Sequence, residues 1–178
     1  FYTAGIKTTA CSEVYSEFVP SYDATCIAKL KTAGAIILGK TVTTPYAASD
    51  PSPTMNPWSH HRTPGGSSSG SAVGVAARMF PAALGSQTGG SVLRPASYNG
   101  VVGLKPTFGR ISKYGVFPVA WSLDTVGVFS RTVEDASILL EVLSGHDPKD
   151  KSSVHRHKPS HQAALKSNDP PRVGLVRK

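Results

Sequence analysis

Two loops rich in glycine and serine contain the residues of this chain that are best suited to chemistry. Residues 65–71 read Gly-Gly-Ser-Ser-Ser-Gly-Ser, and residues 85–91 read Gly-Ser-Gln-Thr-Gly-Gly-Ser. A serine hydroxyl becomes a strong nucleophile when a nearby base accepts its proton. Glycines beside such a serine let backbone N–H groups converge on the oxyanion that develops during acyl transfer. The end of the second loop therefore suits a serine nucleophile with an adjoining oxyanion hole.

Three other interpretations of these loops stay open. Glycine loops at helix N-termini bind phosphate, although the pattern G-x-x-x-x-G-K-[ST] is absent and Lys105 is followed by proline. Residues 66–70 match G-x-S-x-G, the nucleophile elbow of α/β-hydrolases, but that elbow needs a strand directly before it, and residues 58–64 do not read as one. A flexible linker is the third interpretation, and the apolar segments around both loops disfavour it.

The histidines of this chain are poorly placed to act as the base for a serine. His60 and His61 lie in a proline-rich loop, and the other four lie in or near a basic tail: His146, His155, His157 and His161. The tail histidines have no carboxylate nearby to support a metal, so no metal site is expected. A lysine can act as the base instead if it is neutral, a form that burial favours.

The first half of the chain contains elements that can position the loops. Ser21 or Asp23 can cap a helix that runs to about Ala33, and Gly34 ends it. The apolar residues 35–38 follow at once and predict a short buried strand. The order of helix, glycine and apolar strand is typical of an α/β protein with a parallel sheet.

Further elements follow in the second half of the chain. Five prolines predict that residues 41–66 form a loop, and residues 72–77 predict a helix of small side chains. Thr132 and Asp135 resemble a capping box at the start of a helix that runs to about Ser144 and ends before glycine. Residues 173–176 are apolar and predict the start of another strand.

Charge and cysteine content narrow the class of protein. The net charge is +8, and residues 149–178 hold eight Lys/Arg against two Asp/Glu, whereas residues 1–148 hold eleven against nine. The basic excess thus belongs to a tail that lacks aromatic interleaving, so no nucleic-acid partner is expected. Cys11 and Cys26 fit reduced thiols of a cytoplasmic protein, and no apolar run is long enough for a membrane span.

Several motifs together resemble the amidase signature family. The principal matches are residues 63–71, 85–95, 99–107 and 109–112, and the flanking matches are residues 33–41, 56–58, 123–127 and 131–135. The resemblance covers residues 1–150, which we expect to form a partial amidase signature core. Residues 151–170 are expected to be a basic polar loop or linker, and residues 171–178 the start of a further strand.

The resemblance implies a fold, a reaction and a set of site residues. Members of this family have an α/β fold with a mixed, mainly parallel sheet covered by helices. They hydrolyse carboxylic amides through a Ser–cisSer–Lys triad and an acyl-enzyme. By position, Ser91 is the nucleophile, and Ser67, preceded by a cis peptide bond, is the bridging serine. The backbone amides of Thr88, Gly89 and Gly90 form the oxyanion hole. A small-molecule amide is the expected substrate, without a cofactor, and a homodimer is possible for the full-length protein.

The lysine of this triad is not among the residues of the sequence. In the family it lies in a segment shortly before the stretch that matches residues 3–5. Lys40 matches a different lysine of the family, and Lys7 and Lys105 are expected to have structural or surface roles. Members are also more than twice as long as this chain. We therefore expect this piece alone to be inactive.

Two residues of the second loop bear on which branch of the family the chain resembles. Gln87 stands where the transfer-RNA amidotransferase subunit commonly has Asp, and Arg94 stands one place later than the arginine of that subunit. Both favour a stand-alone amidase. A subunit of the glutamyl/aspartyl-tRNA amidotransferase and a non-catalytic truncated remnant stay open as alternatives. Arg94 either binds an anionic group or holds the loop.

Overall fold

A three-stranded antiparallel sheet is the centre of the computed structural model, which describes residues 1–156, 160–166 and 174. Its strands are β1 (Ala82–Gln87), β2 (Val102–Leu104) and β3 (Thr125–Ser130), in the order β1-β3-β2. The register places Ala82 opposite Ser130 on one side of β3 and Val102 opposite the same residue on the other. All six residues of β3 are buried.

The described sheet corrects the expectation of mainly parallel pairing. β3 lies between β1 and β2 and runs against both of them, so the two strands that share a direction are not neighbours. A helix between two strands is typical of parallel pairing, but here α3 (Leu93–Asn99) connects strands that are separated by β3. The α/β class itself agrees with the structure.

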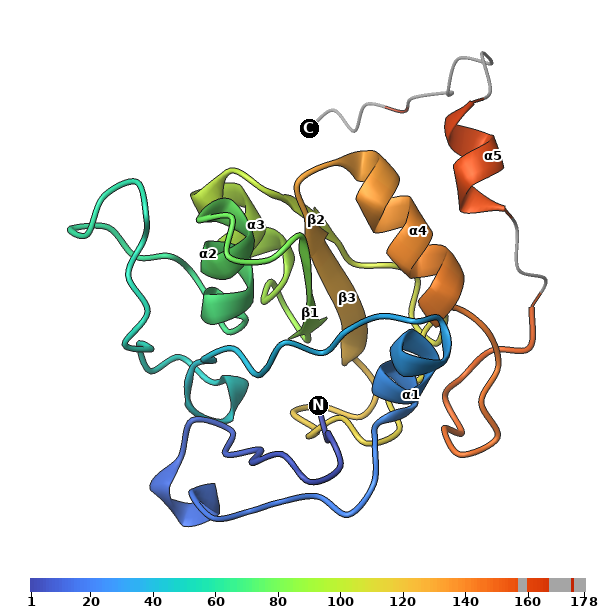
Figure 1. Ribbon diagram of the computed structural model, residues 1–178, viewed down its shortest axis with the longest axis horizontal. Helices are drawn as coiled ribbons and strands as arrows, with labels where there is room; N and C mark the ends of the chain where they lie inside the picture. The colour runs from blue at the N-terminus through green and yellow to red at the C-terminus, as the bar shows by residue number, and fades with distance from the viewer. Residues whose placement is uncertain (157–159, 167–173, 175–178) are drawn as a thin grey trace.

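Helices cover both faces of the sheet and enclose two apolar cores (Figure 1). On one face, α2 (Ser69–Ala76) and α3 pack around Phe129 of β3. On the other face, α1 (Thr25–Thr32) and α4 (Val133–Leu143) pack around Val126 and Val128 of the same strand. Alternate side chains of a strand point to opposite faces, so β3 supplies both cores.

The helix before the first predicted strand is confirmed, but the strand is not. α1 starts a few residues later than expected, and Gly34 follows it with a φ of +85°. Residues 35–38 form no strand, and Ile36 and Leu38 are 84% and 72% exposed. An apolar run becomes a strand only where another strand pairs with it, and none of the described residues does so here.

The capped helix in the second half of the chain is confirmed. Thr132 Oγ1 accepts a hydrogen bond from Asp135 N at 3.1 Å, and the helix ends at Leu143. At that end, Lys29 Nζ donates to the carbonyl oxygens of Leu143 and Ser144 at 2.9 and 3.0 Å. A cation at a helix C-terminus also interacts favourably with the helix dipole. This contact ties α1 to α4.

The remaining elements are short. The proline-rich loop contains one turn of 3-10 helix, η2 (Pro45–Ala47), and the N-terminal segment contains another, η1 (Glu13–Tyr15). The segment expected to be a loop or linker carries α5 (His161–Leu165), which packs on α4. Of the strand predicted at residues 173–176, only Gly174 is described. Cys11 and Cys26 are free thiols, and within residues 1–156 and 160–166 no helix is long and apolar enough to cross a membrane.

Asp147 joins three parts of the chain beneath α4. Its Oδ2 accepts hydrogen bonds from Thr25 Oγ1 and Ser112 Oγ, both at 2.5 Å, and its Oδ1 accepts one from Lys149 N at 2.9 Å. Burial on its own raises the pKa of this carboxyl. The hydrogen bonds from Ser112, Thr25 and Lys149 together lower it by more than burial raises it, so the net pKa lies below its ordinary value. The ionised carboxylate therefore stabilises the fold.

We expect Asp147→Asn to lower the free energy of unfolding by about 1.5–3 kcal/mol near neutral pH, because two hydroxyl donors lose a charged acceptor. The contribution of a carboxyl with a lowered pKa is complete above the ordinary value of about 3.9 and is lost as the pH falls through the lowered pKa. Urea unfolding of the protein that carries this chain should show a difference between wild type and variant that shrinks in acid. Asp50→Asn, at an exposed carboxylate, is the control. A pH-independent difference would contradict the role of the charge.

Candidate active site in the two serine loops

The fold brings the two serine loops together where β1 ends and α2 begins. Ser68 N donates a hydrogen bond to Ser91 O at 3.3 Å, so the first loop contacts the end of the second. Ser68 Oγ also accepts from Ser86 N at 3.3 Å and donates to Ser86 O at 3.4 Å. Ser67, next to this contact, is 2% exposed, while Ser91 is half-buried. The structure thus places the two candidate serines in adjoining backbone segments.

The peptide bond between Gly66 and Ser67 is cis, as the resemblance implies. Its carbonyl oxygen, Gly66 O, accepts hydrogen bonds from Arg94 Nε at 3.2 Å and from Arg94 Nη2 at 2.8 Å. Ser67 O accepts from Thr44 N at 3.0 Å. Of the two roles considered for Arg94, these bonds show the structural one, because the guanidinium on α3 holds the first loop.

Gln87 shapes the second loop from within. Its Oε1 accepts hydrogen bonds from Val92 N and Leu93 N, each at 2.9 Å, and its Nε2 donates to Gly89 O at 3.2 Å. The side chain is 5% exposed. One amide group therefore spans the turn that contains the candidate oxyanion-hole residues, Thr88, Gly89 and Gly90.

Asp124 is a site residue that the sequence did not single out. Thr88 Oγ1 donates a hydrogen bond to Asp124 Oδ1. The other oxygen, Oδ2, accepts from Val119 N at 2.8 Å and from Ala120 N at 2.9 Å. This buried carboxylate therefore connects the second serine loop to the segment before β3. Asp124 lies in the stretch 123–127 that resembles the family, but nothing in that stretch predicts its contact with Thr88.

Gly85 explains why the two loops can approach so closely. A Cβ atom built on this residue would lie 2.5 Å from Phe129 Cε2 and 2.7 Å from Ser68 Oγ. Both distances are far below van der Waals contact. Only glycine therefore lets β1 pass beside the N-terminal end of α2 and keeps Ser68 on the backbone of Ser86.

The three lysines considered from the sequence form hydrogen bonds away from the two serine loops. Lys40 Nζ donates to Phe1 O, and to Thr3 Oγ1 and Thr8 Oγ1 at 3.1 Å each, so all three acceptors lie in the N-terminal segment. This geometry is consistent with the expectation that Lys40 is not the base. Two other lysines are held elsewhere, as expected for structural or surface roles: Lys7 by Glu17 and Lys105 by Pro106 O.

The histidines and the alternative motifs do not provide a second site among the described residues. His146 and His155 are exposed, with ring centroids 5.1 Å apart and ring planes tilted by 50°, and His157 lies outside the described residues. In residues 1–156 and 160–166, no three side chains of His, Cys, Asp or Glu gather as a metal site would require. No strand precedes Ser68, so the nucleophile-elbow interpretation of the first loop is wrong.

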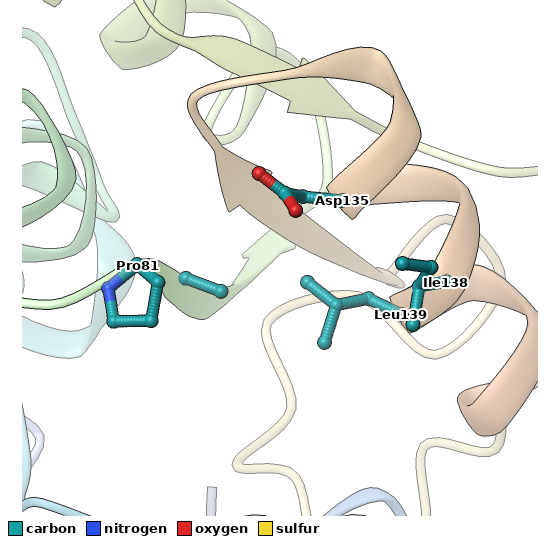
Figure 2. Close-up of a pocket in the computed structure, with 5 residues that line it drawn as sticks. Pro81, Asp135, Ile138 and Leu139 are labelled. Carbon is teal, nitrogen blue, oxygen red and sulfur yellow. The ribbon is translucent and has the colours of Figure 1, made fainter.

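Two shallow apolar hollows lie away from the serine loops. Figure 2 shows the first, of about 200 Å³, at the start of β1 against α4, with Pro81, Asp135, Ile138 and Leu139 around it. The serine loop follows the opposite end of β1. The second hollow, of about 390 Å³, lies between β2, α4 and α5. Neither is lined by a residue of the serine loops, so neither is a candidate substrate pocket for them.

Comparisons with known proteins agree on one family. The family described as Amidase matches residues 1–178. The A subunit of glutamyl-tRNA(Gln) amidotransferase from Carboxydothermus hydrogenoformans is 50% identical over 169 residues, which are 92% of this chain and 35% of that protein. The chain therefore spans about a third of the length of this relative.

Two solved structures are similar to the chain. The crystal structure of the A subunit of glutamyl-tRNA(Gln) amidotransferase from Thermotoga maritima has a TM-score of 0.83 and 46% identity, over 88% of this chain and 36% of that one. The native peptide amidase from Stenotrophomonas maltophilia has a TM-score of 0.87 and 38% identity, over 92% of this chain and 36% of that one.

We expect Gly85→Ala to destabilise the protein by about 1–3 kcal/mol, as overpacking of a filled core typically does, and to lower its activity because Ser68 must move. Thermal unfolding and catalytic rate of the protein that carries this chain measure the two effects. Gly39→Ala is the matched control, since a Cβ there meets nothing within 4 Å and no positive φ is required. Equal stability and rate in both variants would contradict the close approach of β1 and α2.

Proposed function

This chain belongs to the amidase family, and we propose that the protein that carries it cleaves carboxylic amide C–N bonds with Ser91 as the nucleophile. The observation that supports the proposal is the contact between the two serine loops. Ser68 N donates a hydrogen bond to Ser91 O, so the buried Ser67 lies next to the point where the first loop meets the second. Acyl transfer by serine needs a nucleophile, a proton acceptor and donors for the oxyanion within one small volume.

The proposed reaction has two steps. A base accepts the proton of the Ser67 hydroxyl while Ser67 accepts that of Ser91, and Ser91 Oγ attacks the amide carbonyl carbon. The backbone N–H groups of Thr88, Gly89, Gly90 and Ser91 stabilise the oxyanion. The C–N bond then breaks as the leaving nitrogen receives the proton, which releases ammonia or an amine. Water attacks the acyl-enzyme, and the carboxylate product leaves with Ser91 restored.

The base of this proposal is a lysine that the resemblance implies. In the family it lies in a segment shortly before the stretch that matches residues 3–5. Phe1 packs against the core between α1, α4 and the sheet, and Tyr2 is paired on both sides, since its N donates to Gly115 O at 2.8 Å and its O accepts from Ala24 N at 2.9 Å. The N-terminal residues are thus fixed to the core.

We further propose that the protein acts as the A subunit of a glutamyl-tRNA(Gln) amidotransferase, where glutamine is the amide that supplies ammonia. The relatives of that name are 45–52% identical to the chain, whereas the amidase-family protein of Bacillus anthracis and the peptide amidase are 36% and 38% identical. This reverses the preference for a stand-alone amidase that Gln87 and Arg94 suggested. Both side chains bond to the loop backbone, so neither difference needs a different substrate.

A stand-alone amidase remains the second candidate because the shape of the chain does not separate the two. The TM-score is 0.87 with the peptide amidase and 0.83 with the amidotransferase subunit. The difference between the two candidates therefore lies in substrate and partners, which activity measurements address directly.

We expect Ser91→Ala to lower the rate of ammonia release by at least about 10³-fold, because the nucleophile is removed. Ser67→Ala should cost about 10²–10⁴-fold, the usual contribution of proton transfer. The assay uses the full-length protein, from its natural start to its natural stop, with glutamine and with simple aliphatic and aromatic amides. Ser16→Ala, at an exposed serine, is the control. An active Ser91→Ala variant would refute the proposed nucleophile.

The same assay distinguishes an amidotransferase subunit from a stand-alone amidase. An amidotransferase subunit should release ammonia from glutamine and do so faster once partner subunits co-purify with it. A stand-alone amidase should hydrolyse the simple amides alone, with a rate that partner subunits do not change.

A further inference from the structure

One short segment, residues 40–44, connects the N-terminal segment to the first serine loop. In Figure 1 the chain after α1 runs across the molecule to η2 and passes the end marked N. At the start of this connecting segment, the Lys40 ammonium donates to Phe1 O, Thr3 Oγ1 and Thr8 Oγ1. An ammonium has three N–H donors and no acceptor, so all of its donors are used by the N-terminal segment.

Three other residues of the connecting segment, Thr41, Val42 and Thr44, are bonded to the first serine loop and α2. Thr44 N donates to Ser67 O at 3.0 Å, and Val42 O accepts from Gly70 N at 2.9 Å. The hydroxyl groups of Thr41 and Ser71 are 2.7 Å apart. Four of the five residues of this segment thus carry bonds, which reach residues 1–8 at one end and Ser67 at the other.

We propose that Lys40 is a positioning residue for the amide-cleaving reaction, which fixes the N-terminal segment relative to Ser67 through the connecting segment. This inference rests on the proposed function, in which the base is the lysine that the resemblance implies next to the N-terminal segment. Lys40 touches neither the serines nor the substrate in this role. It sets the distance over which the base must reach the Ser67 hydroxyl.

The chemistry of the Lys40 site agrees with this role. Although the residue as a whole is exposed, desolvation of the ammonium lowers its pKa. Holding a charged group at this cost requires compensating hydrogen bonds, and the three acceptors supply them. A surface lysine with no such role, such as Lys7, instead pairs with a single exposed carboxylate, Glu17.

The test compares Lys40→Met, Lys40→Arg and Lys7→Met in the full-length protein, with ammonia release from glutamine as the assay. We expect Lys40→Met to lower kcat by about 10²-fold, the size of effect that a misplacement of about 1 Å produces. KM should change by less than about threefold, since substrate binding is not involved. Lys40→Arg keeps several donors and should recover most of the rate. Lys7→Met should match wild type, because an exposed ion pair contributes little.

Thr8→Val provides a second variant that leaves Lys40 in place and removes one acceptor. We expect a smaller fall in kcat, and no further fall when Thr8→Val is added to Lys40→Met, because the two residues share one contact. Thr8→Val on its own also tests the inference if Lys40→Met fails to fold, since a normal kcat would then contradict the role of this contact.

Three results would overturn the inference, and they are distinct from a failure of the proposed function. Lys40→Met with normal kcat in folded protein would remove the positioning role, even if its melting temperature falls. A Lys40→Arg variant that is as inactive as Lys40→Met and has lost the acidic limb of its pH–rate profile, where the rate rises as a base loses its proton, would make Lys40 the base itself. If the effects of Thr8→Val and Lys40→Met on kcat were fully additive, the two residues would not act through one shared contact. Activity in Ser91→Ala would instead refute the function on which the inference rests.

Discussion

The approach of the α2 N-terminus to β1 is the constraint on which the candidate site depends. Gly85 leaves room for Ser68, and Ser68 in turn bonds to the backbone of Ser86 and to Ser91 O. Farther along the same contact, Ser71 Oγ donates to Leu84 O at 2.8 Å. Small hydroxyl side chains here replace the apolar side chains that usually separate a helix from a strand. The two loops therefore meet through one backbone hydrogen bond and through short hydroxyl side chains that bond to the backbone of β1.

Local signals in the sequence predicted α1, α2 and α4, whereas α3 and α5 were not expected. Thr132 caps α4 through its bond with Asp135 N, and Gly34 follows α1 with the positive φ that glycine tolerates. Both features depend on residues within one or two turns. The order of the strands does not, because β3 enters between β1 and β2 from a distant part of the chain. The apolar residues 35–38 show the same limit, since their composition fits a strand whose partner no local pattern can supply.

The residues of the candidate site also differ in whether a local sequence pattern predicts them. Ser67, Ser91 and the glycines between Thr88 and Ser91 could be singled out as candidates because they lie in distinctive short motifs. Asp124 was not, since it meets Thr88 across 36 positions of sequence. The bonds from Lys40 to the N-terminal segment span 32 to 39 positions and have no motif of their own. Residues that support a site are therefore harder to find in a sequence than residues that react, because they are chosen by distance in space.

The amide of Gln87 has a consequence for the variation of this loop. Its oxygen accepts from two N–H groups, while its nitrogen holds the carbonyl of Gly89. An aspartate, which the resemblance finds here in other members, has the oxygens but no N–H to offer. With aspartate, the Gly89 carbonyl would have to find another donor or turn toward solvent, and the following peptide plane would turn with it. Because that plane carries the N–H of Gly90, exchange of one side chain can change the orientation of a candidate oxyanion donor without any change in the glycines themselves.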